Sequence, residues 1–392
     1  MQLVEGIPVW GEPIQEDALK QMRTCALDAR FVALMADHHV GYSVPIGGVV
    51  AYAHHVSPSG VGFDIACGNK AVVTDMNGTE LRSSIKSIMD DVWSRLSFGV
   101  GRVNKLEKVD HELFDDPAWK VRAVGPLKQL ARDQLGTIGG GNHFVDLFTD
   151  EQDRVWIGVH FGSRGLGHRI ATHFIEAGGG KDAMFVAPVL LHIESELGKE
   201  YLEAMRLAGR YAYAGRDWVC GQVLSILGAN PLDEVHNHHN FAWRETHFGE
   251  ELWVVRKGAT PAFPGQSGFV GATMGDTSVI LEGVDSEESK LALYSTVHGA
   301  GRVLSRTQAK GKVQRRSGKV LAAGKVTREV MDERIRSAGV ELRGADVDES
   351  PHCYKKLDEV LEHHKATIRV LHRLTPVGVA MAGPETRDPY KD

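Results

Sequence analysis

Histidines are the residues of this sequence with the most chemistry to offer, and the chain has 19 of them in 392 residues. Several lie in glycine-rich or acid-flanked segments, where loops that converge on a ligand are expected. Together with one carboxylate and one thiol they form a candidate metal-ligand set of Asp64, Cys67, His143, His160 and His236. Imidazole nitrogen, carboxylate oxygen and thiolate sulfur are the donors of a borderline transition-metal site, and a thiolate can also bridge two ions.

Each of these residues also has a purely structural explanation. A lone histidine after an apolar strand is more often a hydrogen-bonded structural residue, and Cys67 alone would be a small buried apolar side chain. Paired histidines such as His38–His39 and His238–His239 recur along the chain, which weakens an argument from any one of them. On residue types alone, the metal site and the structural roles stay open as alternatives.

A second segment, 294–302, could carry a nucleophile. His298 is followed by Gly-Ala-Gly, so its imidazole lies beside a backbone that can approach phosphates closely, and Arg302 could bind an oxyanion through two N–H groups. A histidine that attacks a phosphoryl group would need this layout. The alternative is a glycine turn with a capping histidine. The GxxxxGK[ST] loop is absent from the sequence, so this is not a P-loop enzyme.

Bulk properties limit the partners and the compartment. The net charge of −6 gives no overall basic surface, so an RNA partner would need a local patch, for which segment 309–319 is the candidate; it could equally be a solvated basic loop. The four cysteines form no CxxC pair, which argues against a disulfide framework. No signal sequence or apolar stretch of membrane-spanning length is present, so we expect a cytoplasmic protein without a membrane partner.

The elements that must position these groups alternate irregularly. Short glycine patches separate apolar β-branched runs, which predict strands at 48–52, 155–159 and 252–255. Helical periodicity predicts helices at 17–34, 79–96, 182–212 and 351–370. We therefore predict an α+β fold, a single domain over residues 1–392 with a large mixed β-sheet core surrounded by helices.

The order of these motifs resembles that of the RtcB family of RNA ligases over nearly the whole chain. The matching segments are 37–42 (DHHVGY), 45–47 (PIG), 62–68 (GFDIACG), 139–144 (GGGNHF), 160–165 (HFGSRG), 236–237 (HN), 256–259 (RKGA), 298–302 (HGAGR), and 348–349, 351 and 354–355 (DE, P and YK).

The resemblance implies an enzyme that joins RNA ends bearing a 2′,3′-cyclic phosphate or 3′-phosphate to 5′-hydroxyl ends, in RNA repair or tRNA splicing, using GTP and two Mn²⁺ ions. It implies that Asp64, Cys67 and His143 hold one manganese, while Cys67, His160 and His236 hold the other. It also implies that His298 carries GMP covalently. An RNA-end or nucleotide-binding paralogue with little ligation activity, and a metal phosphoesterase, remain alternatives. Neither the need for a helper protein nor the oligomeric state follows from the sequence.

The resemblance also implies a nucleotide site. Its residues would be Asn142, His143, Phe144, Val145, Asp146, His236, Asn237, Gly271, Ala272, Thr273, Met274, Ser278, His298, Gly299, Ala300 and Gly301. Three positions depart from the family pattern. Asp146 replaces a glutamate that reads the guanine edge, the loop from Gly271 to Gly275 differs, and Ala382 replaces a lysine. These departures predict a divergent paralogue with relaxed guanine selectivity.

Overall fold

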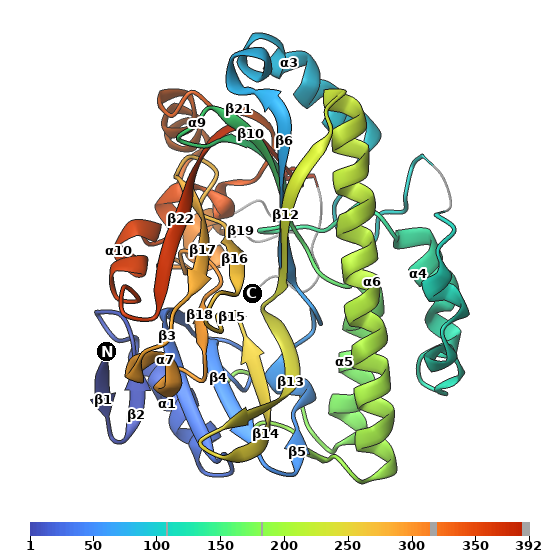
Figure 1. The fold of residues 1–392 in the computed structure, drawn as a ribbon, viewed down its shortest axis with the longest axis vertical. Coiled ribbons are helices and arrows are strands. Elements are labelled where there is room, and N and C mark those ends of the chain that lie inside the picture. The colour runs from blue at the N-terminus through green and yellow to red at the C-terminus, as the bar shows by residue number, and fades with distance from the viewer. Residues whose placement is uncertain (107–108, 182, 314–319, 386–392) are drawn as a thin grey trace.

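Two β-sheets form the centre of the protein in the computed structural model, which describes residues 1–106, 109–181, 183–313 and 320–385 (Figure 1). The first sheet has six strands in the order β1-β2-β3-β4-β14-β13. Their bounds are β1 Gln2–Val4, β2 Ile7–Val9, β3 Phe31–His39, β4 Ile46–Tyr52, β14 Glu250–Lys257 and β13 Asn240–His247.

The second sheet has eight strands and supplies most of the candidate metal ligands. Seven follow the order β12-β6-β10-β9-β22-β17-β16, and β21 pairs in parallel with β22. Their bounds are β12 Pro231–His238, β6 Gly68–Asn77, β10 Arg154–His160, β9 Phe144–Thr149, β22 Ile368–Met381, β17 Ser278–Gly283, β16 Ser267–Val270 and β21 Glu341–Gly344.

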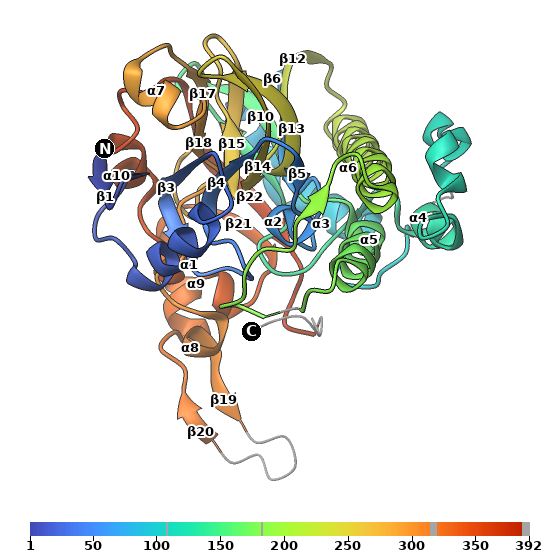
Figure 2. The same ribbon diagram turned by 90° about the horizontal axis from the view of Figure 1, so that it is seen from below.

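Four two-stranded pairs complete the described strands. One of them, β19–β20, extends away from the body (Figure 2), and another, β15–β18, leads into the segment of His298. The pairs are β5 His55–Val56 with β11 Leu191–His192, β7 Ser97–Phe98 with β8 Thr137–Ile138, β15 Ala259–Pro261 with β18 Ser295–Val297, and β19 Gly311–Val313 with β20 Val320–Ala323.

Helices cover the outside of the sheets, and the longest, α6 (Glu196–Leu227), runs along one face of the eight-stranded sheet beside α5 (Figure 1). Ser195 caps it by accepting a hydrogen bond from Gly198 N–H, and Gly228 ends it in a left-handed conformation with φ 63°. Among the described residues, no helix is both long and apolar enough to cross a membrane. The other helices are α1 Glu16–Ala26, α2 Pro58–Val61, α3 Gly78–Arg95, α4 Lys128–Gln134, α5 Arg164–Ala177, α7 Glu287–Leu291, α8 Arg306–Lys310, α9 Arg328–Ser337 and α10 Leu357–Glu362.

The central strands β9 and β10 of the eight-stranded sheet are buried on both faces, which explains their apolar runs. In β10, Val155 and Ile157 pack into one core cluster with residues of α3 and α6, while Trp156 packs into a cluster on the opposite face. Alternate side chains of a strand point to opposite faces, so both faces must be apolar here. Packing on both faces fixes the positions of the ends of these central strands.

The structure confirms the α+β class and the large mixed sheet. The predicted strands at 48–52, 155–159 and 252–255 lie in β4, β10 and β14, and the predicted helix at 79–96 is α3.

Three other predicted helices were wrong in part. In 17–34 the helix ends at Ala26 and β3 begins at Phe31; in 182–212 the helix begins only at Glu196; and in 351–370 a short α10 gives way to β22. Short apolar runs fit a buried strand as well as a helix, which is why periodicity failed at these places. Of the basic segment 309–319, residues 314–319 lie outside the described residues.

Candidate functional site

Three predicted metal ligands meet at one edge of the eight-stranded sheet. Cys67 directly precedes β6, His143 directly precedes β9, and His160 is the last residue of β10. Because β10 pairs antiparallel with both neighbours, its end lies beside their beginnings: His160 is opposite Asn69 on one side and Phe144 on the other. The register of the sheet therefore brings together residues that are far apart in sequence.

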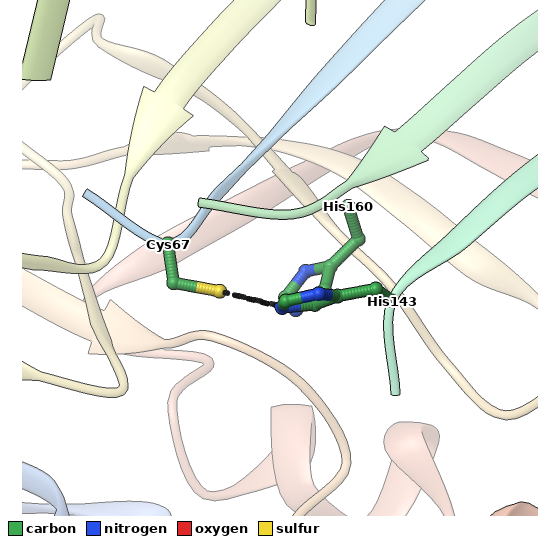
Figure 3. Close-up of side chains that lie close together, drawn as sticks. All are labelled: Cys67, His143 and His160. Carbon is green, nitrogen blue, oxygen red and sulfur yellow. Dashed lines mark hydrogen bonds between the residues drawn. The ribbon is translucent and has the colours of Figure 1, made fainter. Parts of the chain in front are cut away.

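The donor atoms of these residues point toward one another (Figure 3). Cys67 Sγ lies 3.5 Å from His160 Nε2 and 3.6 Å from His143 Nε2. Asp64 Oδ2 lies 3.0 Å from His143 Nε2. Behind His160, the Asn69 side-chain oxygen lies 2.5 Å from Nδ1 and accepts its hydrogen, so the lone pair is on Nε2 and faces the sulfur. This arrangement is typical of a histidine prepared to bind a metal ion.

A third imidazole, that of His239, packs against the cluster. Its ring stacks on His160 with centroids 5.1 Å apart and meets the ring of His298 at 5.0 Å. Its backbone N–H donates to Cys67 O, and its Nδ1 is buried with no hydrogen-bond partner among the described residues. An unpartnered buried nitrogen beside a thiol and two imidazoles is what a missing ligand bond would explain.

The structure corrects the prediction for His236, which does not join this cluster. Arg216 Nε donates to its Nε2 at 2.8 Å, and its Nδ1 lies 3.5 Å from Asp217 Oδ1. The physical reason is strand periodicity. His236 lies inside β12, where it and His238 both face Arg216 of α6, whereas His239 follows the strand end and turns into the site.

A pair of variants tests this correction. His239→Ala should lower the metal affinity of the protein by about 10–100-fold or more, whereas His236→Ala should leave it within about twofold. The reason is that His239 packs on His160 with a buried nitrogen that has no partner among the described residues, whereas Nε2 of His236 accepts a hydrogen bond from Arg216. Titration with Mn²⁺ followed by isothermal calorimetry measures both. Equal losses in the two variants would contradict the assignment of His239.

Burial sets the protonation of the candidate ligands. It lowers the pKa of His160 and His239 well below the ordinary value, so both imidazoles are neutral near pH 7 with a lone pair to donate. Burial opposes the ionisation of Asp64, but His143 outweighs it and lowers the pKa to about 2. Burial, and next the charge of Asp64, raises the pKa of Cys67 well above its usual value. A divalent cation must therefore displace the thiol proton when it binds.

His298 lies at the other side of the same cavity and is held by a buried carboxylate. Asp37, in β3, accepts hydrogen bonds from His298 Nδ1 at 2.6 Å, from His298 N at 3.0 Å and from Gly299 N at 3.3 Å. Burial opposes the ionisation of Asp37, but the charge and hydrogen bonds of His298 outweigh it and hold its pKa below the usual value. Since the carboxylate fixes hydrogen on Nδ1, the lone pair of His298 is on Nε2.

Two glycines make room for this pair. At Gly258, with φ +62°, a Cβ would lie 3.1 Å from the His298 ring, and at Gly301, with φ +77°, it would lie 2.3 Å from Asp37 O. Any larger residue would have to move either the histidine or the strand that carries its partner. Gly258 and Gly301 therefore leave the space that the His298–Asp37 pair needs.

A cavity of about 580 Å³ joins the cluster to His298. Most of the predicted nucleotide-site residues line it: Asn142, His143, Phe144, Asp146, Gly271, Ala272, Thr273, Met274, His298, Gly299, Ala300 and Gly301. This volume is in the range of small-ligand sites.

Four predicted nucleotide contacts do not line the cavity, and the structure corrects them. His236 faces α6, and Asn237 accepts a hydrogen bond from Phe269 N, which joins β12 to β16. Val145 points into the core, because it alternates along β9 with Phe144 and Asp146. Ser278 accepts a hydrogen bond from Ala272 N at 2.9 Å and so positions the 271–274 loop from behind.

Asp146 is an unusual group in this wall. It is buried, its Oδ1 has no hydrogen-bond partner among the described residues, and burial raises its pKa well above the ordinary value. Beside it Met381 lines the cavity, whereas Ala382 packs into the core cluster on the other face of the sheet. Burial thus favours the uncharged form of the Asp146 carboxyl group at this end of the cavity, where Met381 adds apolar surface.

Sequence reasoning missed three residues that line or support the site. Asp37 and His239 were noticed only as members of histidine-rich motifs, and a partner 261 residues from His298 carries no local signal. The third is Arg164, whose Nη1 lies 3.4 Å from His143 Nδ1 and whose Nε is buried without a partner among the described residues. Arg302, which the sequence offers as an oxyanion-binding residue, donates hydrogen bonds to Tyr354 Oη and to Asp348 O.

Comparison with known proteins gives consistent matches along the chain. The family described as RtcB, tRNA-splicing ligase RtcB, matches residues 19–124 and 118–382. The RNA-splicing ligase RtcB of Escherichia coli K12 is 31% identical over 95% of this chain and 96% of its own length. The protein of the same name from Mycobacterium tuberculosis is 32% identical over 88% and 95%, and the tRNA-splicing ligase RtcB of Thermococcus kodakarensis is 28% identical over 90% and 87%.

Proposed function

Since this chain belongs to the RtcB family, described as tRNA-splicing ligases, we propose that it is an RNA ligase that seals 3′-phosphate or 2′,3′-cyclic phosphate ends to 5′-hydroxyl ends through a histidine-guanylate intermediate. The observation that carries the proposal is the His298–Asp37 pair, because it leaves a nucleophilic nitrogen facing the cavity that also holds the thiol and imidazole cluster.

The residues present fit a site for two divalent metal ions. One thiol, one carboxylate and three imidazoles supply soft and borderline donors; Nδ1 of His239 has no partner among the described residues, and Nε2 of His160 faces the Cys67 sulfur. Cys67 would be shared, with Asp64 and His143 on one side and His160 and His239 on the other. Manganese bound there would neutralise charge on phosphoryl oxygens.

The chain's own residues account for the covalent step. His298 Nε2 attacks the α-phosphorus of GTP; the new N–P bond forms as the bond to pyrophosphate breaks, and Asp37 stabilises the positive charge on the imidazole. GMP then passes to the RNA 3′-phosphate, a cyclic end having first been hydrolysed, and His298 is released. The 5′-hydroxyl oxygen attacks the activated phosphorus, the RNA bond forms, and GMP leaves.

Incubation with GTP labelled at its α-phosphate, with Mn²⁺ present, tests this proposal. We expect an acid-labile label on the protein, which then disappears when RNA carrying the two ends is added and a joined product forms. A protein that binds RNA ends without taking label would instead be a binding paralogue. Release of phosphate from RNA ends without labelling would indicate a metal phosphoesterase.

We expect the labelling reaction to prefer GTP over ATP less strongly than it would with an ionised carboxylate at position 146. Guanine offers two N–H donors to an ionised carboxylate, but burial disfavours the ionised form of Asp146, and an uncharged carboxyl both donates and accepts, which also suits adenine. We expect a discrimination of no more than about 1–3 kcal/mol between GTP and ATP. Competition between the two nucleotides for protein labelling measures it. A preference for GTP of many thousandfold would contradict this prediction.

A further inference from the structure

Some residues of the cavity wall do not belong to the proposed nucleotide site, and together they form what we call the second arm. They are Phe63, Leu130 of α4, and His168 and Arg169 of α5, which line the same cavity as Asp146, Met381 and the 271–274 loop. Figure 2 shows α4 and α5 together at one flank of the molecule. A ligase must bind RNA as well as a nucleotide, so the residues of the second arm are candidates for contacts with the RNA.

An aromatic stack forms the wall of this arm. The rings of Phe63 and His168 are stacked with centroids 5.0 Å apart and an interplanar angle of 26°, and Tyr42 meets Phe63 edge-on at 6.2 Å. Both stacked rings line the cavity and both are only half-buried. A half-buried aromatic stack at the side of a cavity is a surface on which a further planar ring can be placed.

The charge of the arm fits a polyanion. Arg169 is exposed and forms no ion pair with any described residue, and Arg164 lies between the arm and the metal cluster with a buried, unpartnered Nε. The carboxylates among the described residues that line the cavity are Asp64, Asp146 and Glu349, and Glu349 is paired with Arg302 and Arg306. The guanidinium groups of Arg164 and Arg169 therefore favour the binding of phosphates beside Phe63 and His168.

We propose that Phe63 and His168 form a stacking platform for the terminal nucleobase of the RNA end that carries the phosphate. This inference rests on the proposed function. Phe63 adjoins the candidate ligand Asp64, so their Cα atoms are about 3.8 Å apart. A terminal phosphate held at Arg164 and the metal cluster thus leaves its own base beside Phe63, and Arg169 is placed for the next phosphate of a single strand. Stacking tolerates any base, as an enzyme that repairs varied ends requires.

The test is a chemical double-mutant cycle on RNA binding. The probe is a short fluorescent single-stranded RNA with a 3′-phosphate, and its partner lacks only the terminal base. We expect Phe63→Leu to weaken binding of the complete probe by roughly 5- to 50-fold, because the apolar volume stays while the π-face is lost. For the wild-type protein, removal of the terminal base from the probe should weaken binding by a similar factor. For the Phe63→Leu variant, the abasic and complete probes should bind almost equally well.

Two variants control for other effects. Phe63→Trp keeps an aromatic face and should bind nearly as well as the wild-type protein, while Phe248→Leu, at an exposed position outside this cavity, should change nothing. The proposal is overturned if the wild-type protein binds the abasic probe as tightly as the complete probe. It is also overturned if removal of the terminal base weakens RNA binding by the same factor in the wild-type protein and in the Phe63→Leu variant. The labelling assay without RNA tests the proposed function separately. A protein that binds RNA through Phe63 but takes no label would contradict the proposed ligation and would still support the stacking platform.

Discussion

His298→Ala should abolish formation of the protein–GMP adduct, with a loss of at least about 10⁴-fold in labelling, while metal and nucleotide still bind. The nucleophile is removed, but the thiol, carboxylate and imidazole donors come from the ends of β6, β9, β10 and β12, which do not depend on the 298–302 segment. Labelling with α-phosphate GTP, together with Mn²⁺ titration of the same protein, measures both quantities.

A second substrate separates covalent catalysis from mere binding. If the transfer of GMP to RNA is the step that needs the histidine, RNA supplied with a pre-activated 3′-end should be sealed, at least partly, by the His298→Ala variant. His54→Ala removes an exposed histidine outside the cavity and serves as the matched control, with labelling unchanged. Labelling of the His298→Ala variant at wild-type level would show that another residue is the nucleophile.

The place of the metal cluster could be anticipated from the sequence, because three ligand candidates lie where glycine-bounded loops meet apolar strands. The pairing that brings Cys67, His143 and His160 together is long-range, however, and only the register of β6, β10 and β9 shows it. A pattern of types and spacing names strand ends but does not say which ends are neighbours.

The HNHHN run shows where such reasoning fails. His236 and His239 have different surroundings because β12 ends at His238, between them. A strand end can be predicted from sequence only to within about two to four residues, which is as far apart as these two histidines are. A shift of one position in the assumed end of a strand exchanges the buried face for the opposite one. The resemblance named His236, whereas the structure places His239 against His160 and His236 against Arg216.

The Asp37–His298 contact could not be predicted from local pattern. It joins β3 of the six-stranded sheet to the loop after β18, and the segment 17–34 that precedes Asp37 had been expected to be helical throughout. The same holds for the raised pKa of Asp146, which depends on burial created by β22 beside β9. Electrostatic properties of this kind require the packed structure.

Cys67→Ala should have the second large effect, the loss of both metal ions. Its sulfur lies at 3.5 and 3.6 Å from the two imidazole nitrogens of His160 and His143, between the two halves of the donor set, so one substitution removes a ligand from each ion. We expect metal affinity to fall by more than about 100-fold at both sites, and labelling with GTP to disappear with it. Metal analysis of the purified protein by mass spectrometry measures the occupancy.

Variants of the flanking ligands make this prediction specific to a shared thiolate. His143→Ala and His160→Ala should each weaken mainly one ion, because each imidazole belongs to one half of the site. Cys25→Ala, at another buried free cysteine outside the cavity, should keep full occupancy and so controls for the general effect of losing a buried thiol. Full metal occupancy in the Cys67→Ala variant would contradict the bridging role of the sulfur. Loss of only one ion would assign the sulfur to a single metal. Adding His143→Ala or His160→Ala to that variant would then show which histidine binds the remaining ion.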